Sequence, residues 1–190
     1  MRVARYIALL VFFLDLPVPV YWLILHPLTE FWRTRVRAAF WIAGLGAWTL
    51  GGIFVVLERN RLIASSAPSI FAALGGGILI AADVIILLRA DRDLGHSKLV
   101  GHAEITGKAD LTTSGMYSRV RHPRYTGMIA AVAGACVLAG SRWAWVCFAV
   151  WVALVMISIL LEEREMRRRF GDGYRDYCAR TPRFVPTIFR

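Results

Sequence analysis

Two short polar motifs lie at opposite ends of a pair of apolar segments. Arg121-His122-Pro123 comes just before the first segment, and Glu162-Glu163 follows directly after the second. Pro123 suits the first turn of a helix, which would then direct its positive N-terminal end, together with Arg121 and His122, toward one point. Such a point binds carboxylates or phosphates, whereas the two glutamates favour a cationic centre, an amine or a ribose hydroxyl.

A hairpin of the two apolar segments would bring these motifs together. The segments are residues 125–140 and 143–161, and the turn falls at Ser141 and Arg142. Counted from the turn, Tyr125 and Glu162 differ by about four residues, which is ~6 Å along a helix. One ligand that carries a carboxylate, an amino group, a sulfonium and a ribose would satisfy both motifs at once. The residues therefore predict a site for S-adenosylmethionine.

The elements that must position these motifs are membrane-spanning helices. Of the 190 residues 57% are hydrophobic, and the mean hydropathy is +0.54, which is above the range of soluble domains. Five apolar segments can be delimited, and all but the fourth are long enough to cross ~30 Å of hydrocarbon. They are residues 6–25, 38–57, 67–88, 125–140 and 143–161. We expect an all-α integral membrane protein with five transmembrane helices, the first of them kinked at Pro17 and Pro19.

The lysine and arginine residues lie mostly on one side of this topology. Of the 23, five fall at the N-terminus and in the second and fourth connections, and the rest fall in the first and third connections and the C-terminal tail. The positive-inside rule then places the C-terminus in the cytoplasm and the N-terminus outside a bacterial-type inner membrane. The net charge of +10 is concentrated beside membrane spans, and no nucleic-acid-binding motif accompanies it, so we expect no nucleic-acid partner.

The chain divides into four parts of a single membrane domain. Residues 1–88 are expected to form a three-helix scaffold, 89–124 a cytoplasmic loop, 125–161 the helical hairpin and 162–190 a cytoplasmic tail. Glycines in the second and third helices suit close helix packing in lipid. The cysteines show no ligand-like spacing, and we therefore expect neither a disulfide framework nor a metal site.

The motifs around the hairpin also resemble a known superfamily. The pattern reads Gly115-x-Tyr117-x3-Arg121-His122-Pro123-x-Tyr125-x-Gly127, followed after the hairpin by Glu162-Glu163, Phe170-Gly171, Tyr174, Tyr177 and Pro186. It is similar to that of the membrane methyltransferase superfamily of isoprenylcysteine carboxyl methyltransferases and phospholipid N-methyltransferases. The resemblance covers about half of the chain, residues 94–186, and its motifs are specific in combination rather than singly.

The resemblance implies a small prokaryotic member with five spans and a cofactor-binding hairpin. It implies transfer of a methyl group from S-adenosylmethionine to a lipid or lipidated small molecule that enters from the inner leaflet. The transfer would be direct, with the protein supplying positioning and exclusion of water. Glu163 and Arg121 are the expected catalytic residues. The expected cofactor-binding residues are Tyr117, Arg121, His122, Pro123, Tyr125, Glu162, Glu163, Tyr174, Tyr177 and His96.

One departure from the isoprenylcysteine enzymes bears on the acceptor. Those enzymes are expected to carry an arginine shortly before the acidic pair, where it can hold the carboxylate of the acceptor, but residues 156–159 read Met-Ile-Ser-Ile here. A carboxylate would then have to be recognised by Arg92, Arg180 or Arg183. Three alternatives stay open: a phospholipid amine N-methyltransferase, an NADPH-dependent membrane sterol-type reductase with a similar C-terminal half, and a non-catalytic membrane scaffold.

Several other charged residues have simpler interpretations. Arginines at the ends of membrane helices commonly extend toward lipid phosphates. We assign this role to Arg119, Arg124, Arg167, Arg168 and Arg169. Two aspartates lie inside apolar segments, where a carboxylate must face protein or water. Asp15 is expected to make a structural hydrogen bond, and Asp83 is a weaker candidate for contact with cofactor or substrate.

Overall fold

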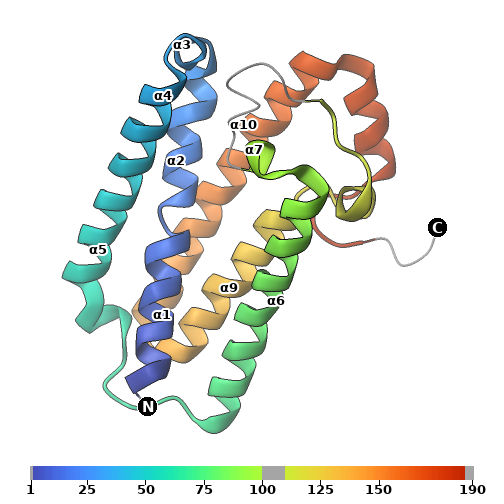
Figure 1. The fold of residues 1–190 in the computed structure, drawn as a ribbon. Coiled ribbons are helices and arrows are strands. Elements are labelled where there is room, and N and C mark those ends of the chain that lie inside the picture. Colours follow the sequence, from blue (N-terminus) through green and yellow to red (C-terminus); the bar gives the residue numbers. More distant parts are fainter. Residues whose placement is uncertain (1, 100–109, 187–190) are drawn as a thin grey trace.

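The structure of the chain is a computed structural model, which describes residues 2–99 and 110–186 (Figure 1). All regular elements in these residues are helices. They are α1 (Arg2–Asp15), α2 (Val18–Leu25), η1 (His26–Leu28), α3 (Thr29–Arg33), α4 (Val36–Ala39), η2 (Phe40–Leu45), α5 (Gly46–Leu62), α6 (Ile70–Leu94), α7 (His96–Leu99), η3 (Gly115–Ser118), α9 (Pro123–Ala139) and α10 (Arg142–Arg180). The predicted loop 89–124 and tail 162–190 lie partly outside the described residues.

The predicted membrane helices are present. Four helical stretches are long and apolar enough to cross a bilayer, namely Val3–Arg33, Val36–Leu62, Ile70–Leu94 and Arg142–Arg180. The fifth, α9, has 17 residues, which corresponds to ~25 Å. Large apolar side chains point away from the protein, and those of Leu57 and Phe71 are 74% and 83% exposed. Apolar side chains exposed in such number need lipid around them, and the all-α membrane fold is confirmed.

Two of these stretches contain an irregular segment, the first near its middle and the second near its start. The first is broken between α1 and α2 at Leu16 and Pro17, with Pro19 near the start of α2, and this is the predicted kink. Proline lacks the N–H that a continuous helix would use. In the second stretch, η2 is a π-helix between α4 and α5. Short π-helical segments are frequent at functional sites.

Two helices extend beyond their predicted ends. α6 continues to Leu94 instead of ending at residue 88, and α10 continues to Arg180 instead of ending at residue 161. Hydropathy marks where a helix leaves the hydrocarbon, not where its hydrogen bonding stops, and the polar residues beyond both points include good helix formers. α10 bends at Gly171, whose φ of 54° and ψ of −125° are not helical. Residues 172–180 therefore turn back across the end of the bundle (Figure 1).

The hairpin helix α9 lies at the centre of the molecule, between α6, α1 and α10 (Figure 1). At the contact between α6 and α9 the backbones approach each other at Gly76 and Gly134. A Cβ on Gly76 would meet the carbonyl oxygen of Gly134 at 2.8 Å, and the reverse substitution gives 2.6 Å. Small residues at such points let helices pack closely in lipid, where no hydrophobic force drives them together.

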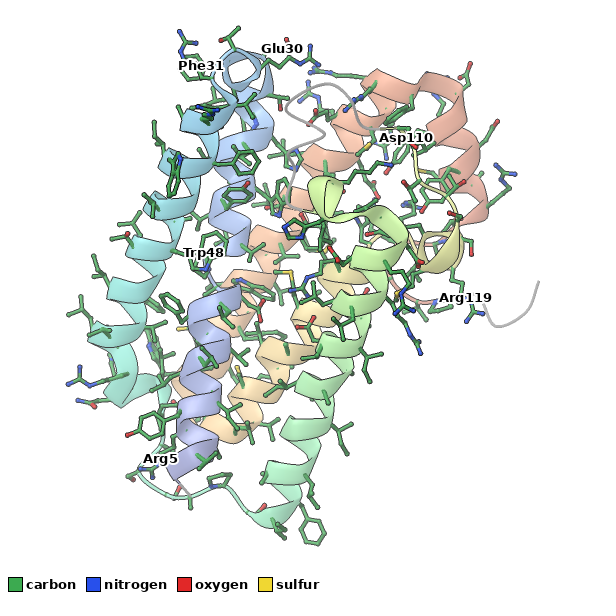
Figure 2. All side chains as sticks on the ribbon, viewed as in Figure 1. Arg5, Glu30, Phe31, Trp48, Asp110 and Arg119 are labelled. Carbon is green, nitrogen blue, oxygen red and sulfur yellow. The ribbon has the colours of Figure 1, made fainter. Side chains whose placement is uncertain are left out.

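The connections divide between the two ends of the bundle. The N-terminus, the connection from α5 to α6 and the turn from α9 to α10 lie at one end, and α3, α7 and the last part of α10 lie at the other (Figure 1). Figure 2 shows Arg5 at the first end and Glu30 and Asp110 at the second. The start of α9 and residues 162–180 of α10 thus meet at the end opposite their turn, as the hairpin predicted.

Candidate functional site

A cavity of about 530 Å³ lies at the open end of the hairpin formed by α9 and α10. Ligand pockets in proteins typically measure ~300–1,000 Å³. Residues from four regions line it: the segment leading into α9, the part of α10 beyond residue 161, the membrane-embedded faces of α2, η2, α5 and α6, and α7 with residues 110–112. The two polar motifs of the sequence therefore meet at one cavity, and the scaffold helices complete its wall.

Glu163 stands at the centre of a buried ion-pair network, here called the Glu163 cluster. Its carboxylate has no exposed surface. Oε1 lies 3.0 Å from Nη2 of Arg121 and 3.2 Å from Nε2 of His122. Oε2 accepts hydrogen bonds from Arg167 at 3.1 Å and from Arg183 at 2.8 Å. The hydrogen bond to Glu163 raises the pKa of Arg183 above its usual value, so that this guanidinium stays charged.

The two expected catalytic residues point mainly at other parts of the protein. Arg121 lines the cavity, but besides its bonds to Glu163 it donates through Nη1 to the backbone carbonyls of Cys178, at 3.2 Å, and Thr181. Glu163 is not among the residues that line the cavity, because Arg121 and His122 lie in front of it. Through these bonds, the side chains of Arg121 and Glu163 join the segment before α9, the middle of α10 and the residues that follow α10.

Of the two adjacent glutamates, Glu162 is the one that faces the cavity. Its side chain is 21% exposed, and Oε1 lies 3.8 Å from Nδ1 of His122. Met166, one helical turn further along α10, lines the cavity on the same side. Glu162 therefore offers the cavity a carboxylate whose hydrogen-bonding capacity is not consumed by arginines, in contrast to Glu163.

Three tyrosines close the cavity on the side away from the membrane. Tyr117 comes from η3, and Tyr174 and Tyr177 come from α10 beyond its bend. The hydroxyl of Tyr177 donates to the backbone carbonyl of Tyr117 at 2.6 Å, and the rings of Tyr174 and Tyr177 lie 6.0 Å apart. Burial raises the pKa of Tyr117 well above its usual range, which keeps its phenol protonated. The bend at Gly171 is what brings the second and third of these rings over the cavity.

The residues after α10, 181–184, form a strap along the segment that precedes α9. The backbone N–H of Arg121 donates to the carbonyl of Pro182 at 2.9 Å, and that of His122 donates to the carbonyl of Arg183 at 3.1 Å. The ring of Phe184 lies 6.4 Å from that of His122. Backbone pairing and the bond from Arg183 to Glu163 thus hold the strap at two points.

The rim of the cavity includes charged residues near α7. His96 lines the cavity with an exposed side chain, and its Nδ1 lies 3.3 Å from Asp91. Lys98 also lines it, donates to Thr112 at 2.9 Å and pairs with Asp110. The hydrogen bond from Lys98 lowers the pKa of Asp110. These polar pairs surround the opening on the side of α6.

The membrane-embedded half of the cavity is aromatic and apolar. Trp22 of α2, Phe40 and Gly44 of η2, and Leu87 of α6 contribute to it. A Cβ on Gly44 would meet no atom within 4 Å, so the space beside η2 is open. The scaffold predicted for residues 1–88 is therefore more than a support, because its first two spans form part of the wall.

A second ion-pair network, here called the Arg124 cluster, lies at the base of the cavity. Arg124 lines the cavity and pairs with Asp83 of α6, and its Nη2 lies 3.6 Å from Oδ1 of Asp15 at the end of α1. Both aspartates are buried. The assignment of Arg124 to lipid phosphates is wrong, because a guanidinium next to two buried carboxylates turns inward. Arg167, assigned to lipid phosphates as well, pairs with Glu163 one helical turn away but is 51% exposed, and its contact with lipid stays a prediction.

Nearly all predicted cofactor-binding residues line the cavity. They are Tyr117, Arg121, His122, Pro123, Tyr125, Glu162, Tyr174, Tyr177 and His96. Glu163 is the exception. Among the described residues, the three arginines considered for recognition of a carboxylate, Arg92, Arg180 and Arg183, do not line the cavity. The binding of a cofactor by these residues stays a prediction, which the geometry of the cavity makes specific.

Sequence reasoning missed the aromatic wall and one residue of α10. Met166 could have been found from helical periodicity, since it lies four residues after Glu162. The mid-membrane prolines were a weaker signal for the wall, because a broken membrane helix often lies beside a cavity. Nothing in the sequence indicated that η2 would contribute Phe40 and Gly44 to the same wall.

Comparisons with known proteins agree with the region in which the cavity lies. A sequence profile of the phospholipid methyltransferase family matches residues 71–173, more than half of the chain. A segment of 71 residues is 37% identical to Methanethiol S-methyltransferase 1 of Bradyrhizobium diazoefficiens, and it amounts to 37% of this chain and 24% of that protein. The chain thus spans about a quarter of the length of this curated relative. No solved structure matches. From the extent of the profile match, as the resemblance predicted, the chain belongs to the phospholipid methyltransferase family.

Proposed function

We propose that this protein is a membrane methyltransferase that uses S-adenosylmethionine and acts on an apolar, lipid-like acceptor. The observation that carries the proposal is the cavity at the open end of the hairpin, which one polar motif lines from α9 and the other from α10. Membership of the phospholipid methyltransferase family supports the class of reaction. The mixed wall, polar at one end and apolar at the other, suits a polar methyl donor that meets an apolar acceptor.

The residues of the polar half fit S-adenosylmethionine. Glu162 presents a carboxylate that can accept hydrogen bonds from an amino group or ribose hydroxyls. The rings of Tyr117, Tyr174 and Tyr177 offer faces for a purine and for a sulfonium cation. His122 adds a polar group at the start of α9, where the helix N-terminus favours an anionic group such as the carboxylate of the donor.

In this mechanism the protein positions the two substrates and excludes water, and it forms no covalent intermediate. S-adenosylmethionine, when bound, would supply a methyl group on a sulfonium: the methyl carbon bonds to a lone pair of the acceptor while its bond to sulfur breaks, and the sulfur leaves with that electron pair as a neutral thioether. Tyr117 and Tyr177, linked through the hydroxyl of Tyr177, close the cavity against water. Arg121 and Glu163 fix the segment before α9 and the strap, and thereby the position of His122. We therefore assign Glu163 a positioning role and Glu162 the contact with the donor.

The acceptor is proposed to enter from the inner leaflet along the apolar half of the cavity. Trp22, Phe40 and Leu87 offer aromatic and aliphatic contacts there. Residues 156–159 contain no arginine, and Arg121 and Arg124, which line the cavity, are already paired with carboxylates of the protein, which disfavours an acceptor held by a free carboxylate. A phospholipid amine is one candidate. A thiol is a second, because the relative that shares 37% identity over 71 residues is named for methylation of methanethiol.

Calorimetric titration of the purified protein separates the classes of function. S-adenosylhomocysteine should bind, and NADPH should not, in the same detergent. Glu162→Gln should weaken binding of S-adenosylhomocysteine about tenfold, the amount expected when a charge-assisted hydrogen bond is lost. Binding of NADPH alone would favour the sterol-type reductase, and binding of neither ligand would favour a non-catalytic scaffold.

The acceptor can be identified with donor labelled by tritium in the methyl group. Membranes that contain the protein are incubated with this donor, and the label is followed before and after treatment with base. Label that stays in the lipid fraction after base would indicate an amine. Label released as methanol by base would indicate an ester, and label that is volatile before base would indicate a small thioether.

The proposed orientation is an N-terminus outside the cytoplasmic membrane and a C-terminus in the cytoplasm. It rests on the positive-inside rule, since α3 and α4, which contain Arg33 and Arg37, lie at the same end of the bundle as the last part of α10 (Figure 1). Cysteine substitutions at exposed Arg35 and Arg59 should react with an impermeant thiol reagent from opposite sides of sealed vesicles. Labelling of both from one side would overturn the orientation.

A further inference from the structure

A second cavity, of about 500 Å³, lies on another face of α10. Four of its lining residues from α10, at positions 161, 164, 165 and 168, recur with the spacing of a single helix face. Glu162 and Met166, which line the first cavity, lie on a different face of the same helix. The opposite wall comes from η1 and α3, through His26, Thr29 and Arg33. This cavity is therefore a separate site that shares only α10 with the first.

Its charges are strongly unbalanced toward the positive. Glu30 pairs with Arg33 at 3.1 Å, and Glu165 lies 3.0 Å from His26, so both carboxylates in the wall have partners. Within residues 2–99 and 110–186, Arg164, Arg168 and Arg169 form no ion pair, although all three line the cavity. Three uncompensated guanidinium groups around one cavity attract an anion.

One of these arginines carries a more specific signal. Nη1 of Arg169 is buried and finds no hydrogen-bond partner among the described residues. Buried polar atoms are nearly always hydrogen-bonded, and an exception in a cavity calls for a partner that fills the cavity. Guanidinium groups bind phosphate oxygens with paired, charge-assisted hydrogen bonds. Nη1 of Arg169 and the guanidinium groups of the exposed Arg164 and Arg168 can together donate hydrogen bonds to a phosphate.

The position of the cavity along the membrane normal indicates where the phosphate comes from. His26 and Leu161 lie at the ends of apolar runs, where the first and last spans leave the hydrocarbon. Phospholipid head groups lie at this level, and basic pockets between membrane helices bind them. A soluble phosphate would have to compete there with a high local concentration of lipid phosphate.

We propose that the second cavity binds the phosphate group of an anionic phospholipid, with Arg164, Arg168 and Arg169 as its donors. The site is distinct from the first cavity and independent of the methyltransferase proposal. The two cavities are nevertheless neighbours, because the ring of Trp22, in the first wall, stacks at 5.0 Å and 19° on the ring of His26, in the second.

Native mass spectrometry of the delipidated full-length protein tests the site. The protein is titrated with phosphatidylglycerol and, separately, with phosphatidylcholine, in which the positive charge of the choline neutralises the negative charge of the phosphate. The test variant is Arg164→Gln/Arg168→Gln, in which both side chains are exposed and their replacement leaves the packing intact. The matched control is Arg175→Gln/Arg180→Gln, which removes the same charge from the same helix, and neither of these residues lines either of the two cavities.

Phosphatidylglycerol should bind more tightly than phosphatidylcholine, and the test variant should lose about tenfold or more of this affinity, as expected for lost charge-assisted hydrogen bonds. The control should keep it, and Arg169→Gln should lose it as well. Displacement of the lipid by inorganic phosphate would support the same site with a soluble phosphate as its source. Equal losses in test and control variants, or equal binding of the two lipids, would overturn the proposal.

Discussion

The Glu163 cluster and the Arg124 cluster have opposite arrangements of charge. The first places three arginines and a histidine around one fully buried carboxylate, and the second places one arginine between two buried aspartates. They lie only a few residues apart along the chain, since Arg121 belongs to the first and Arg124 to the second. The excess charge is therefore positive beside the aqueous end of the cavity and negative at its membrane end.

This difference separates two structural tasks. Two of the three arginines of the Glu163 cluster are partly exposed, Arg167 to 51% and Arg183 to 33%, so water compensates the excess charge of the cluster. The aspartates of the Arg124 cluster have no such compensation, because they lie in membrane-embedded helices. The Glu163 cluster orders loops at the surface, whereas the Arg124 cluster fastens α1, α6 and α9 to one another inside the bilayer.

The largest effect is expected from Arg124→Gln. This change leaves Asp15 and Asp83 in the membrane without a cation, and removal of one partner of a buried pair typically costs about 3–5 kcal/mol. Thermal or denaturant unfolding in detergent should show this loss. Arg119→Gln, at an exposed arginine five residues before it, should leave the unfolding midpoint unchanged.

A compensating variant distinguishes the charge from the shape of Arg124. Asp83→Asn combined with Arg124→Gln replaces the closest ion pair by two neutral amides and should recover part of the lost stability. If the double variant were no more stable than Arg124→Gln, packing and not charge would be the source of the loss.

The next largest effect is expected from Glu163→Gln. Three guanidinium groups then lose their carboxylate, but because those of Arg167 and Arg183 reach water we expect a loss of about 2–3 kcal/mol in unfolding free energy. Binding of S-adenosylhomocysteine should weaken as well, since His122 and the strap lose their anchor. Glu162→Gln should weaken binding without lowering stability, and this contrast can be measured by calorimetry and thermal unfolding on the same samples.

The opposite result would contradict the roles assigned to the two glutamates. If Glu163→Gln abolished turnover with no change of stability, and Glu162→Gln changed neither, the catalytic assignment of Glu163 from the sequence would stand and its positioning role would fall. The variants differ by one residue in position and carry the same charge change, so each serves as the control for the other.

The two clusters also differ in how far the sequence predicted them. Arg121, His122 and Glu163 stand in motifs at the two ends of an apolar hairpin, and helix lengths alone bring those ends together. Arg124 stands in the same motif, but its partners come from α1 and α6, and no sequence pattern indicates which faces of those two helices turn toward it. Periodicity fixes the spacing within a helix and the length of a span, and says little about which faces of separate spans meet.

The same limit explains the remaining differences. The spans were predicted from hydropathy, which is a local property; four are long enough to cross a bilayer, and the fifth is the shorter helix α9. The extension of α10 to Arg180 and its bend at Gly171 depend on a single backbone conformation that brings Tyr174 and Tyr177 over the cavity. The wall formed by Phe40 and Gly44 depends on a π-helical turn. Neither the bend of α10 nor the π-helical turn can be inferred from amino-acid composition.

Gly127→Ala tests the Arg124 cluster without altering any charge. A Cβ on Gly127 would lie 2.5 Å from Oδ1 of Asp83, so the carboxylate would have to move away from Arg124. Overpacking of this kind costs about 1–2 kcal/mol, less than the loss of the arginine itself. Gly173→Ala is the control, because a Cβ there meets no atom within 4 Å. Equal unfolding midpoints for the two variants would show that the pairing of Asp83 tolerates displacement.

The smallest effect is expected from Arg183→Gln, which removes one of the four partners of Glu163. Arg121, His122 and Arg167 still satisfy the carboxylate, and Arg183 is one-third exposed, so stability should fall by about 1 kcal/mol or less. The strap keeps its backbone bonds to Arg121 and His122 but loses its side-chain anchor. We therefore expect S-adenosylhomocysteine to dissociate faster by a few-fold, as measured by stopped-flow displacement, while Arg180→Gln, outside the strap and the cluster, leaves the rate unchanged. An unchanged rate in both variants would mean that backbone pairing alone holds the strap, and that the excess positive charge of the Glu163 cluster serves the fold and not the ligand.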